Sequence, residues 1–155
     1  MRKLFITVGY SGLSPIAPGT VGSFVSLILI ISLIHFIRVD TMFLITIFIF
    51  VVAIKQINIY EKQTNTHDNQ IIVIDELVGM WFAFLISGAT ANNWLWFAVF
   101  SFVYFRLFDI IKPSIIGKID KNIKGGLGVM GDDAVAGVFA GLSTSLTIYL
   151  LGGLL

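Results

Sequence analysis

The sequence contains no cysteine. Disulfide bonds, zinc–thiolate sites and thiol nucleophiles are therefore all excluded, whatever the compartment in which the protein works. The redox state of that compartment cannot be inferred from this absence. Any metal must be held by oxygen or imidazole ligands, and any covalent intermediate must form on a group other than sulfur.

Charge is the second scarce feature. Only 12% of the 155 residues are charged, whereas roughly a quarter are charged in an ordinary soluble domain. The formal net charge of +1 is too small to indicate a nucleic-acid partner. Hydrophobic residues make up 57% of the chain and the mean hydropathy is +0.95. So apolar a chain must face lipid, and residues 1–155 are expected to form a single membrane domain.

Five apolar stretches indicate an all-α fold, a polytopic membrane helix bundle with about five transmembrane helices. They cover residues 21–37, 42–54, 77–91, 94–105 and 134–155. The first and last approach the roughly 20 residues that a spanning helix needs. The other three reach that length only if their helices continue into the flanking polar residues. The sequence carries no prediction of oligomeric state.

Lysine and arginine predict the orientation of these spans. If the N-terminus is cytoplasmic, nine of the ten basic residues lie in inside segments and only Arg38 lies outside. Such an imbalance is the usual mark of cytoplasmic loops. The acids follow the same division, although the positive-inside rule does not apply to them. Asp40 is outside, and the inside acids are Glu61, Asp68, Asp75, Glu76, Asp109, Asp120, Asp132 and Asp133.

The adjacent acids Asp75 and Glu76 lie between apolar residues at the start of the third stretch. One interpretation is that they only complement the positive end of a helix dipole. That accounts for one acid better than for two with four apolar residues before them. Ionised carboxylates beside hydrocarbon are costly, so they persist where they face a polar cavity, pair with cations or hold a metal. We favour a functional role.

A second group of polar residues covers positions 105–134. On a helix, Arg106, Asp109 and Lys112 would share one face. The glycine-rich residues 124–131 are expected to form a flexible loop with exposed backbone amides, and Asp132 and Asp133 to open the last span. Paired carboxylates beside such a loop suit Mg²⁺, which takes oxygen ligands and commonly bridges to phosphate. The alternative interpretation is a solvated loop before a capped helix.

These groups together predict a site at the inner membrane interface. Carboxylates would hold a divalent cation and basic side chains would bind phosphate. A site at this depth suits an amphipathic substrate with a phosphate head and a lipid tail. A small transporter would instead place ionisable residues in mid-span, and His35, near the outer end of the first span, is the nearest candidate.

Several motifs resemble the phosphatidylglycerophosphatase A family, in matching order along most of the chain. They are Ser14-Pro15-Ile16-Ala17-Pro18-Gly19-Thr20, His67-Asp68 with Asp75-Glu76 and Gly79-Met80-Trp81, Phe105-Arg106-Leu107-Phe108-Asp109 with Lys112-Pro113, and Gly125-Gly126-Leu127-Gly128-Val129-Met130 with Asp132-Asp133 and Ala136-Gly137. Three positions depart from the family pattern. They are Ile115 in place of proline, Gly131 in place of an aliphatic residue and Lys121 in place of arginine.

The resemblance implies a magnesium-dependent phosphatase in the bacterial inner membrane. Its substrate would be phosphatidylglycerol phosphate, which it would cleave to phosphatidylglycerol and phosphate at a cytoplasmic face. Asp75, Glu76, Asp132 and Asp133 are expected to hold Mg²⁺, with Asp109 as a further ligand or orienting group. Arg106, Lys112 and Lys124 are expected to bind the phosphate, and His67, oriented by Asp68, to transfer a proton.

Two points of chemistry stay open in the sequence. The nucleophile is either metal-bound water or an aspartate. The runner-up enzyme class is a lipid phosphotransferase, although its spaced Asp-Gly…Ala-Arg…Gly…Asp…Asp pattern is not visible. Two other phosphatase chemistries are disfavoured, because the chain has no Cys-x5-Arg motif and no Asp-x-Asp-x-Thr/Val motif.

Overall fold

A computed structural model describes residues 2–66 and 69–152. In these residues the chain forms helices and no strand. The helices are α1 (Arg2–Ile6), the 3-10 turn η1 (Ser11–Leu13), α2 (Pro18–Leu33), α3 (Val39–Thr64), α4 (Ile74–Ile86), α5 (Trp94–Ile111), α6 (Ile115–Asn122) and α7 (Gly126–Gly152). The predicted all-α class is confirmed, and each predicted apolar stretch coincides with one of helices α2, α3, α4, α5 and α7.

Within residues 2–66 and 69–152, three helices are by length and composition apolar enough to cross a membrane, namely α3, α5 and α7. Helix α2 is apolar but has only 16 residues, and α4 has 13. Much of the apolar surface of α3 points away from the bundle, as Leu44, Phe48 and Val51 show by their exposure. The longest helices therefore present an apolar outer surface of the kind that faces lipid.

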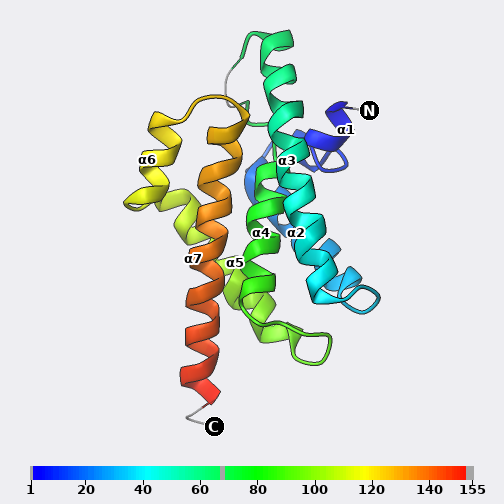
Figure 1. Cartoon of the computed structure of the whole chain (residues 1–155), viewed down its shortest axis with the longest axis vertical. Helices are drawn as coiled ribbons and strands as arrows, with labels where there is room; N and C mark the ends of the chain where they lie inside the picture. The colour runs from blue at the N-terminus through cyan, green and yellow to red at the C-terminus, as the bar shows by residue number, and fades with distance from the viewer. Residues whose placement is uncertain (1, 67–68, 153–155) are drawn as a thin grey trace.

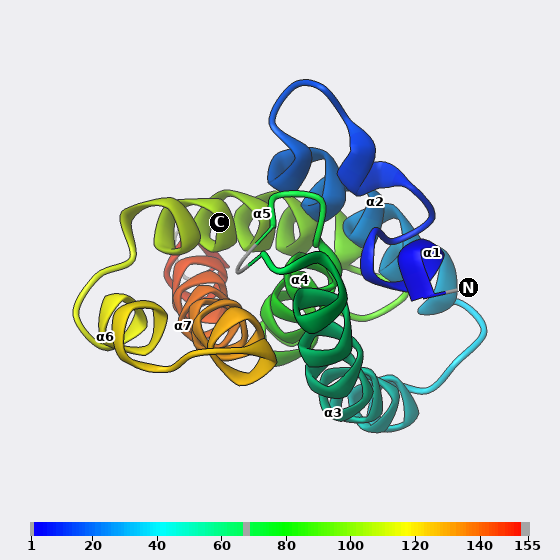
Figure 2. The ribbon, with the colours of Figure 1, turned by 90° about the horizontal axis from the view of Figure 1, so that it is seen from above.

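Helix α4 lies in the middle of the bundle, surrounded by α2, α3, α5 and α7 (Figures 1 and 2). Its central position follows from its composition, because ten of its thirteen residues are buried. Successive long helices run in opposite directions along the bundle (Figure 1). The α3 C-terminus, the α4 N-terminus and the α7 N-terminus lie toward the end that holds residue 2, and the loop from α4 to α5 lies at the opposite end (Figure 1).

Glycines let α4 and α7 approach closely. A Cβ atom at Gly137 would collide with the backbone oxygen of Gly79, and one at Gly141 would collide with Ile86 and Ala83. Gly137 and Gly141 are four residues apart, the small-xxx-small spacing that membrane helices use to pack backbone against backbone. This crossing brings the first turn of α4 and the second turn of α7, which carry the paired acids, toward each other.

Candidate functional site

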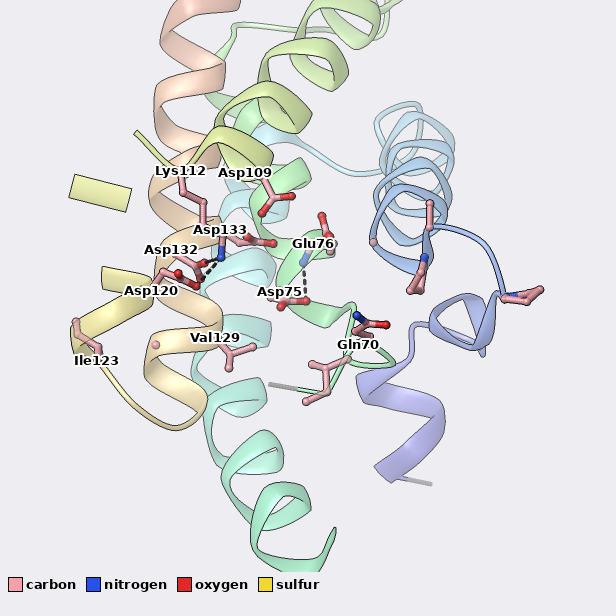
Figure 3. A pocket seen from close by; sticks show the side chains of 16 residues that line it. Gln70, Asp75, Glu76, Asp109, Lys112, Asp120, Ile123, Val129, Asp132 and Asp133 are labelled. Carbon is pink, nitrogen blue, oxygen red and sulfur yellow. Dashed lines mark hydrogen bonds and ion pairs between the residues drawn. The ribbon is translucent and has the colours of Figure 1, made fainter. Parts of the chain in front are cut away.

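A cavity of about 510 Å³ lies where α4 and α7 begin and α5 ends (Figure 3). Loop residues before α2 and side chains of α6 complete its wall. Six carboxylates line it, those of Asp75, Glu76, Asp109, Asp120, Asp132 and Asp133. Within the described part of the chain, Lys112 is the only basic residue among the lining residues. The predicted acids therefore meet at one cavity, and that cavity carries a strong excess of negative charge.

Glu76 is held in place from two helices. One of its oxygens, Oε2, accepts hydrogen bonds from Arg106 Nη1 at 2.7 Å and from Ser23 Oγ at 2.7 Å. The carboxylate also lies against Gly19 in the first turn of α2, where a Cβ atom would collide with Oε1. The Pro-Gly motif at residues 18–19 thus begins α2 and leaves space for this carboxylate.

Arg106 joins two of the acids. Its Nη1 atom lies 2.9 Å from Asp109 Oδ2, three residues along α5, as well as 2.7 Å from Glu76. The predicted shared helix face of Arg106 and Asp109 is confirmed. The guanidinium does not line the cavity but lies behind its wall, against the carboxylates that do. Its predicted contact with phosphate stays a prediction.

Lys112 does not lie on the helix face that it was predicted to share with Arg106 and Asp109. It ends α5 in the left-handed conformation with φ of +47°, and its ammonium group turns toward α6 and α7. Lys112 Nζ lies 2.6 Å from Asp120 Oδ1 and 2.6 Å from Asp132 Oδ2 (Figure 3). The expectation that Lys112 shares the face of Asp109 is wrong, because the helix ends one residue before the lysine. Burial opposes its charge, but the hydrogen bonds to Asp120 and Asp132 prevail and raise the Lys112 pKa above its usual range.

The glycine-rich residues before the acid pair were expected to form a flexible loop, and this is wrong for residues 126–131, which are the first turns of α7. The glycines serve close packing. A Cβ atom at Gly126 would collide with the backbone of Ile54, and one at Gly128 with the backbone of Ile123. Consequently Asp132 and Asp133 lie about two turns inside α7 and not at its start.

Asp132 and Asp133 are almost completely buried, with 4% of each residue exposed. Asp132 Oδ2 is bonded to Lys112, while Asp132 Oδ1 is buried and has no hydrogen-bond partner among the described residues. A buried carboxylate oxygen without a partner is costly, so it suits a ligand that supplies positive charge. This atom is the strongest structural sign that the cavity takes a cation.

The donor set fits magnesium, because carboxylate oxygens are the ligands that hard cations prefer. The set is not preassembled, however. Among residues 2–66 and 69–152, no three acidic or histidine side chains stand together as a ready-made metal site.

Of the remaining predicted residues, only Lys124 is among the described ones. His67 and Asp68 lie outside the described residues. Lys124 is exposed in the turn between α6 and α7 and is not among the residues that line the cavity. Conversely, Ser23 was not predicted, although it is fully buried against Glu76. Asp120 was counted among the inside acids but not assigned to the site that it lines.

Comparison with known proteins agrees with these motifs. The family model for phosphatidylglycerophosphatase A matches residues 4–148. A phosphatidylglycerophosphatase A of Escherichia coli is 38% identical over 87% of this chain and 77% of its own length, and one of Haemophilus influenzae is 32% identical over 87% and 82%.

A third relative, from Bacteroides thetaiotaomicron, bears the name "Putative phosphatidylinositol-3-phosphatase" and is 35% identical over 92% of this chain and 90% of its own. No solved structure matches the chain. The family match covers nearly the whole sequence and includes every described acid of the cavity. The chain therefore belongs to the phosphatidylglycerophosphatase A family of phosphatases.

Proposed function

We propose that this protein is a magnesium-dependent phosphatidylglycerophosphatase, which hydrolyses phosphatidylglycerol phosphate to phosphatidylglycerol and inorganic phosphate. The observation that carries the proposal is the cavity with six carboxylates and Lys112 at one end of an apolar bundle. The printed names of the E. coli and H. influenzae relatives supply the substrate. An apolar bundle beside a polar cavity suits a substrate that is part lipid and part phosphate.

The charge of the cavity supports the need for a cation. A phosphomonoester carries nearly two negative charges at neutral pH, and six carboxylates would repel it. Asp75, Glu76, Asp132 and Asp133 are the residues proposed to hold magnesium, with Asp109 as a further ligand or orienting group. Bound magnesium would supply the positive charge against which the phosphate is held.

The protein's own basic residues have separate tasks in this proposal. Arg106 fixes the carboxylates of Glu76 and Asp109 from behind the wall. Lys112, on the wall itself, would bind a phosphate oxygen and offset charge as the bond to the leaving oxygen breaks. Lys124, exposed between α6 and α7, is the second proposed phosphate contact. His67, oriented by Asp68, is the proposed proton donor to the leaving oxygen.

The membrane placement is part of the same proposal. Helices α2, α3, α4, α5 and α7 would cross the bacterial inner membrane with the N-terminus and the cavity at the cytoplasmic face. The nine basic residues in the segments predicted to lie inside support this orientation. Helices α2 and α4 are short, so their ends would lie below the headgroups beside longer neighbours.

A second candidate substrate is phosphatidylinositol 3-phosphate, which the printed name of the Bacteroides relative favours. Both substrates are phosphomonoesters on a lipid headgroup, and they differ in whether glycerol or an inositol ring carries the phosphate. The cavity carboxylates and Lys112 would interact with the phosphate group in the same way in both substrates.

Phosphate release by the purified protein in detergent tests the assignment. Equal concentrations of phosphatidylglycerol phosphate, phosphatidylinositol 3-phosphate and glycerol 3-phosphate should be compared with Mg²⁺ present. We expect the highest kcat/KM for phosphatidylglycerol phosphate and little release from glycerol 3-phosphate, which lacks acyl chains. A higher kcat/KM for the inositol lipid would support the second candidate, and no release from either lipid would contradict both.

A further inference from the structure

Helix α6 has two faces with different surroundings. On one, Ile116 is buried, Ile119 packs near Gly131 of α7, and Asp120 bonds to Lys112 and lines the cavity. The other carries Lys118 and Lys121, both exposed. These two lysines are three residues apart and therefore share a face. The helix is thus a piece of the cavity wall with a basic outer surface.

Among the described residues, no acid forms an ion pair with the basic face. The ion pairs found among the described residues engage Arg38, Arg106 and Lys112, and none involves Lys118 or Lys121. Asp120, the acid on the same helix, is bonded to Lys112. The positive charge of this face is therefore available to an external anion.

Exposed apolar side chains lie on both sides of the lysines in the chain. Ile110 and Ile111 end α5 with 69% and 63% of their surface exposed, Ile115 begins α6 with 49%, and Ile123 follows it with 37%. Exposing four isoleucines within fourteen residues to water is unfavourable in free energy. Lysines beside exposed apolar groups are the composition of segments that lie at the boundary between headgroups and acyl chains.

We propose that α6 with its flanking isoleucines, residues 110–123, is a docking surface for the headgroups of anionic phospholipids. The inference rests on the membrane placement proposed above. Charge complementarity selects the partner, since the exposed lysines attract phosphate-bearing headgroups and the isoleucines enter the adjacent acyl layer. Helix α6 lies beside the upper part of α7 (Figure 1), and its residue Asp120 lines the cavity.

The surface adjoins the site through α6 itself. Asp120 and Ile123 both line the cavity (Figure 3). A lipid bound by Lys118 or Lys121 would therefore lie on the outer face of the helix that forms this part of the cavity wall. Docking there would raise the concentration of anionic lipid next to the cavity without any new contact inside it. The expected gain is in lipid binding and not in the hydrolytic step.

Lipid-selective quenching tests the proposal, and the absence of cysteine makes the label specific. An Ile115→Cys protein carries a fluorophore and is reconstituted in phosphatidylcholine vesicles with brominated phosphatidylglycerol or brominated phosphatidylcholine. We expect the phosphatidylglycerol to quench about twofold more strongly or better, since each lysine near an anionic surface contributes about fivefold in affinity. High salt should reduce this preference because it screens the lysines.

Two charge variants in the labelled protein complete the test. Lys118→Gln with Lys121→Gln should bring the quenching ratio close to one, whereas the control pair Lys55→Gln with Lys62→Gln, exposed lysines of α3, should leave it unchanged. The proposal would be overturned by equal quenching by both lipids in the parent protein, or by a quenching ratio that does not change with salt. It would also be overturned if the control pair lowered the quenching ratio as much as the α6 pair does. The ratio needs no turnover, so a protein that keeps it but releases no phosphate would refute the proposed activity alone.

Discussion

The carboxylate of Glu76 on α4 accepts a hydrogen bond from the guanidinium of Arg106 on α5 across 2.7 Å. Glu76 lines the cavity and Arg106 lies behind it, with 11% and 15% of the two side chains exposed. Ser23 on α2 donates to the same carboxylate oxygen. Three helices are therefore joined at one acid of the proposed cation site, and each partner restricts where that acid can point.

Replacing Ser23 with alanine tests whether this restriction matters. The Ser23 hydroxyl donates to Glu76 and to the Gly19 carbonyl and accepts from Arg106. Its loss should lower the free energy of unfolding by about 1 kcal/mol or more and leave Glu76 less well oriented. We expect kcat for lipid phosphate release to fall several-fold and more magnesium to be required. Ser26→Ala is the matched control, because Ser26 is equally buried on α2 but donates only to the Gly22 carbonyl. A similar loss of kcat in both variants would contradict a specific role for Ser23.

Alanine at Gly137 tests the close approach of α4 and α7. The added Cβ would meet the backbone oxygen of Gly79, which cannot rotate away, so the helices must separate. We expect a lower thermal midpoint in detergent, by several degrees, together with loss of activity. At Gly131 the same change meets only the end of the Ile119 side chain, and it should be tolerated. Equal midpoints for the two variants would show that the crossing does not depend on Gly137.

The Lys112 contacts make a prediction about pH. Because the folded pKa is raised, the lysine stabilises the fold fully below its unfolded pKa of about 10.4, and this contribution is lost only as pH rises through the higher folded value. Lys112→Gln should therefore reduce thermal stability throughout the range from about pH 6 to 9, because the lysine of the parent protein stays charged across it. A variant as stable as the parent within this window would contradict the assignment.

Two single cysteines test the topology. Asn122 at the end of α6 and Asn92 before α5 are both exposed, and five spans would place them on opposite sides of the membrane. In intact cells a membrane-impermeant maleimide should label Asn92→Cys, and it should label Asn122→Cys only after the cells are opened. Labelling of both sites in intact cells would contradict the five-span arrangement.

The sequence predicted where helices exist better than where they end. Apolar runs located α2, α3, α4, α5 and α7, but α3 continues ten residues past Ile54 and α5 six residues past Phe105. An apolar run stops where the chain leaves hydrocarbon, whereas backbone hydrogen bonding continues into polar sequence. The glycines of residues 126–131 indicated a loop, yet they serve helix packing that only the neighbouring backbone reveals.

The same limit applies to the site. Adjacent acids in apolar surroundings were visible as a pattern, and Arg106 with Asp109 followed from helical spacing. Ser23 carried no such signal. A serine in an apolar helix commonly bonds to the carbonyl four residues earlier, as Ser26 and Ser23 both do. Only the crossing of α2 and α4 shows that Ser23 also faces Glu76.

The most direct test of the account is phosphate release from phosphatidylglycerol phosphate by the purified protein as Mg²⁺ is titrated. We predict release that requires Mg²⁺, stops in chelator, and falls at least a hundredfold, as a rough estimate, in Asp132→Asn and Asp133→Asn. Asp40→Asn, an exposed acid paired with Arg38, should behave as the parent protein. Undiminished release in chelator, or in both Asp132→Asn and Asp133→Asn, would contradict a cation site built from the cavity carboxylates.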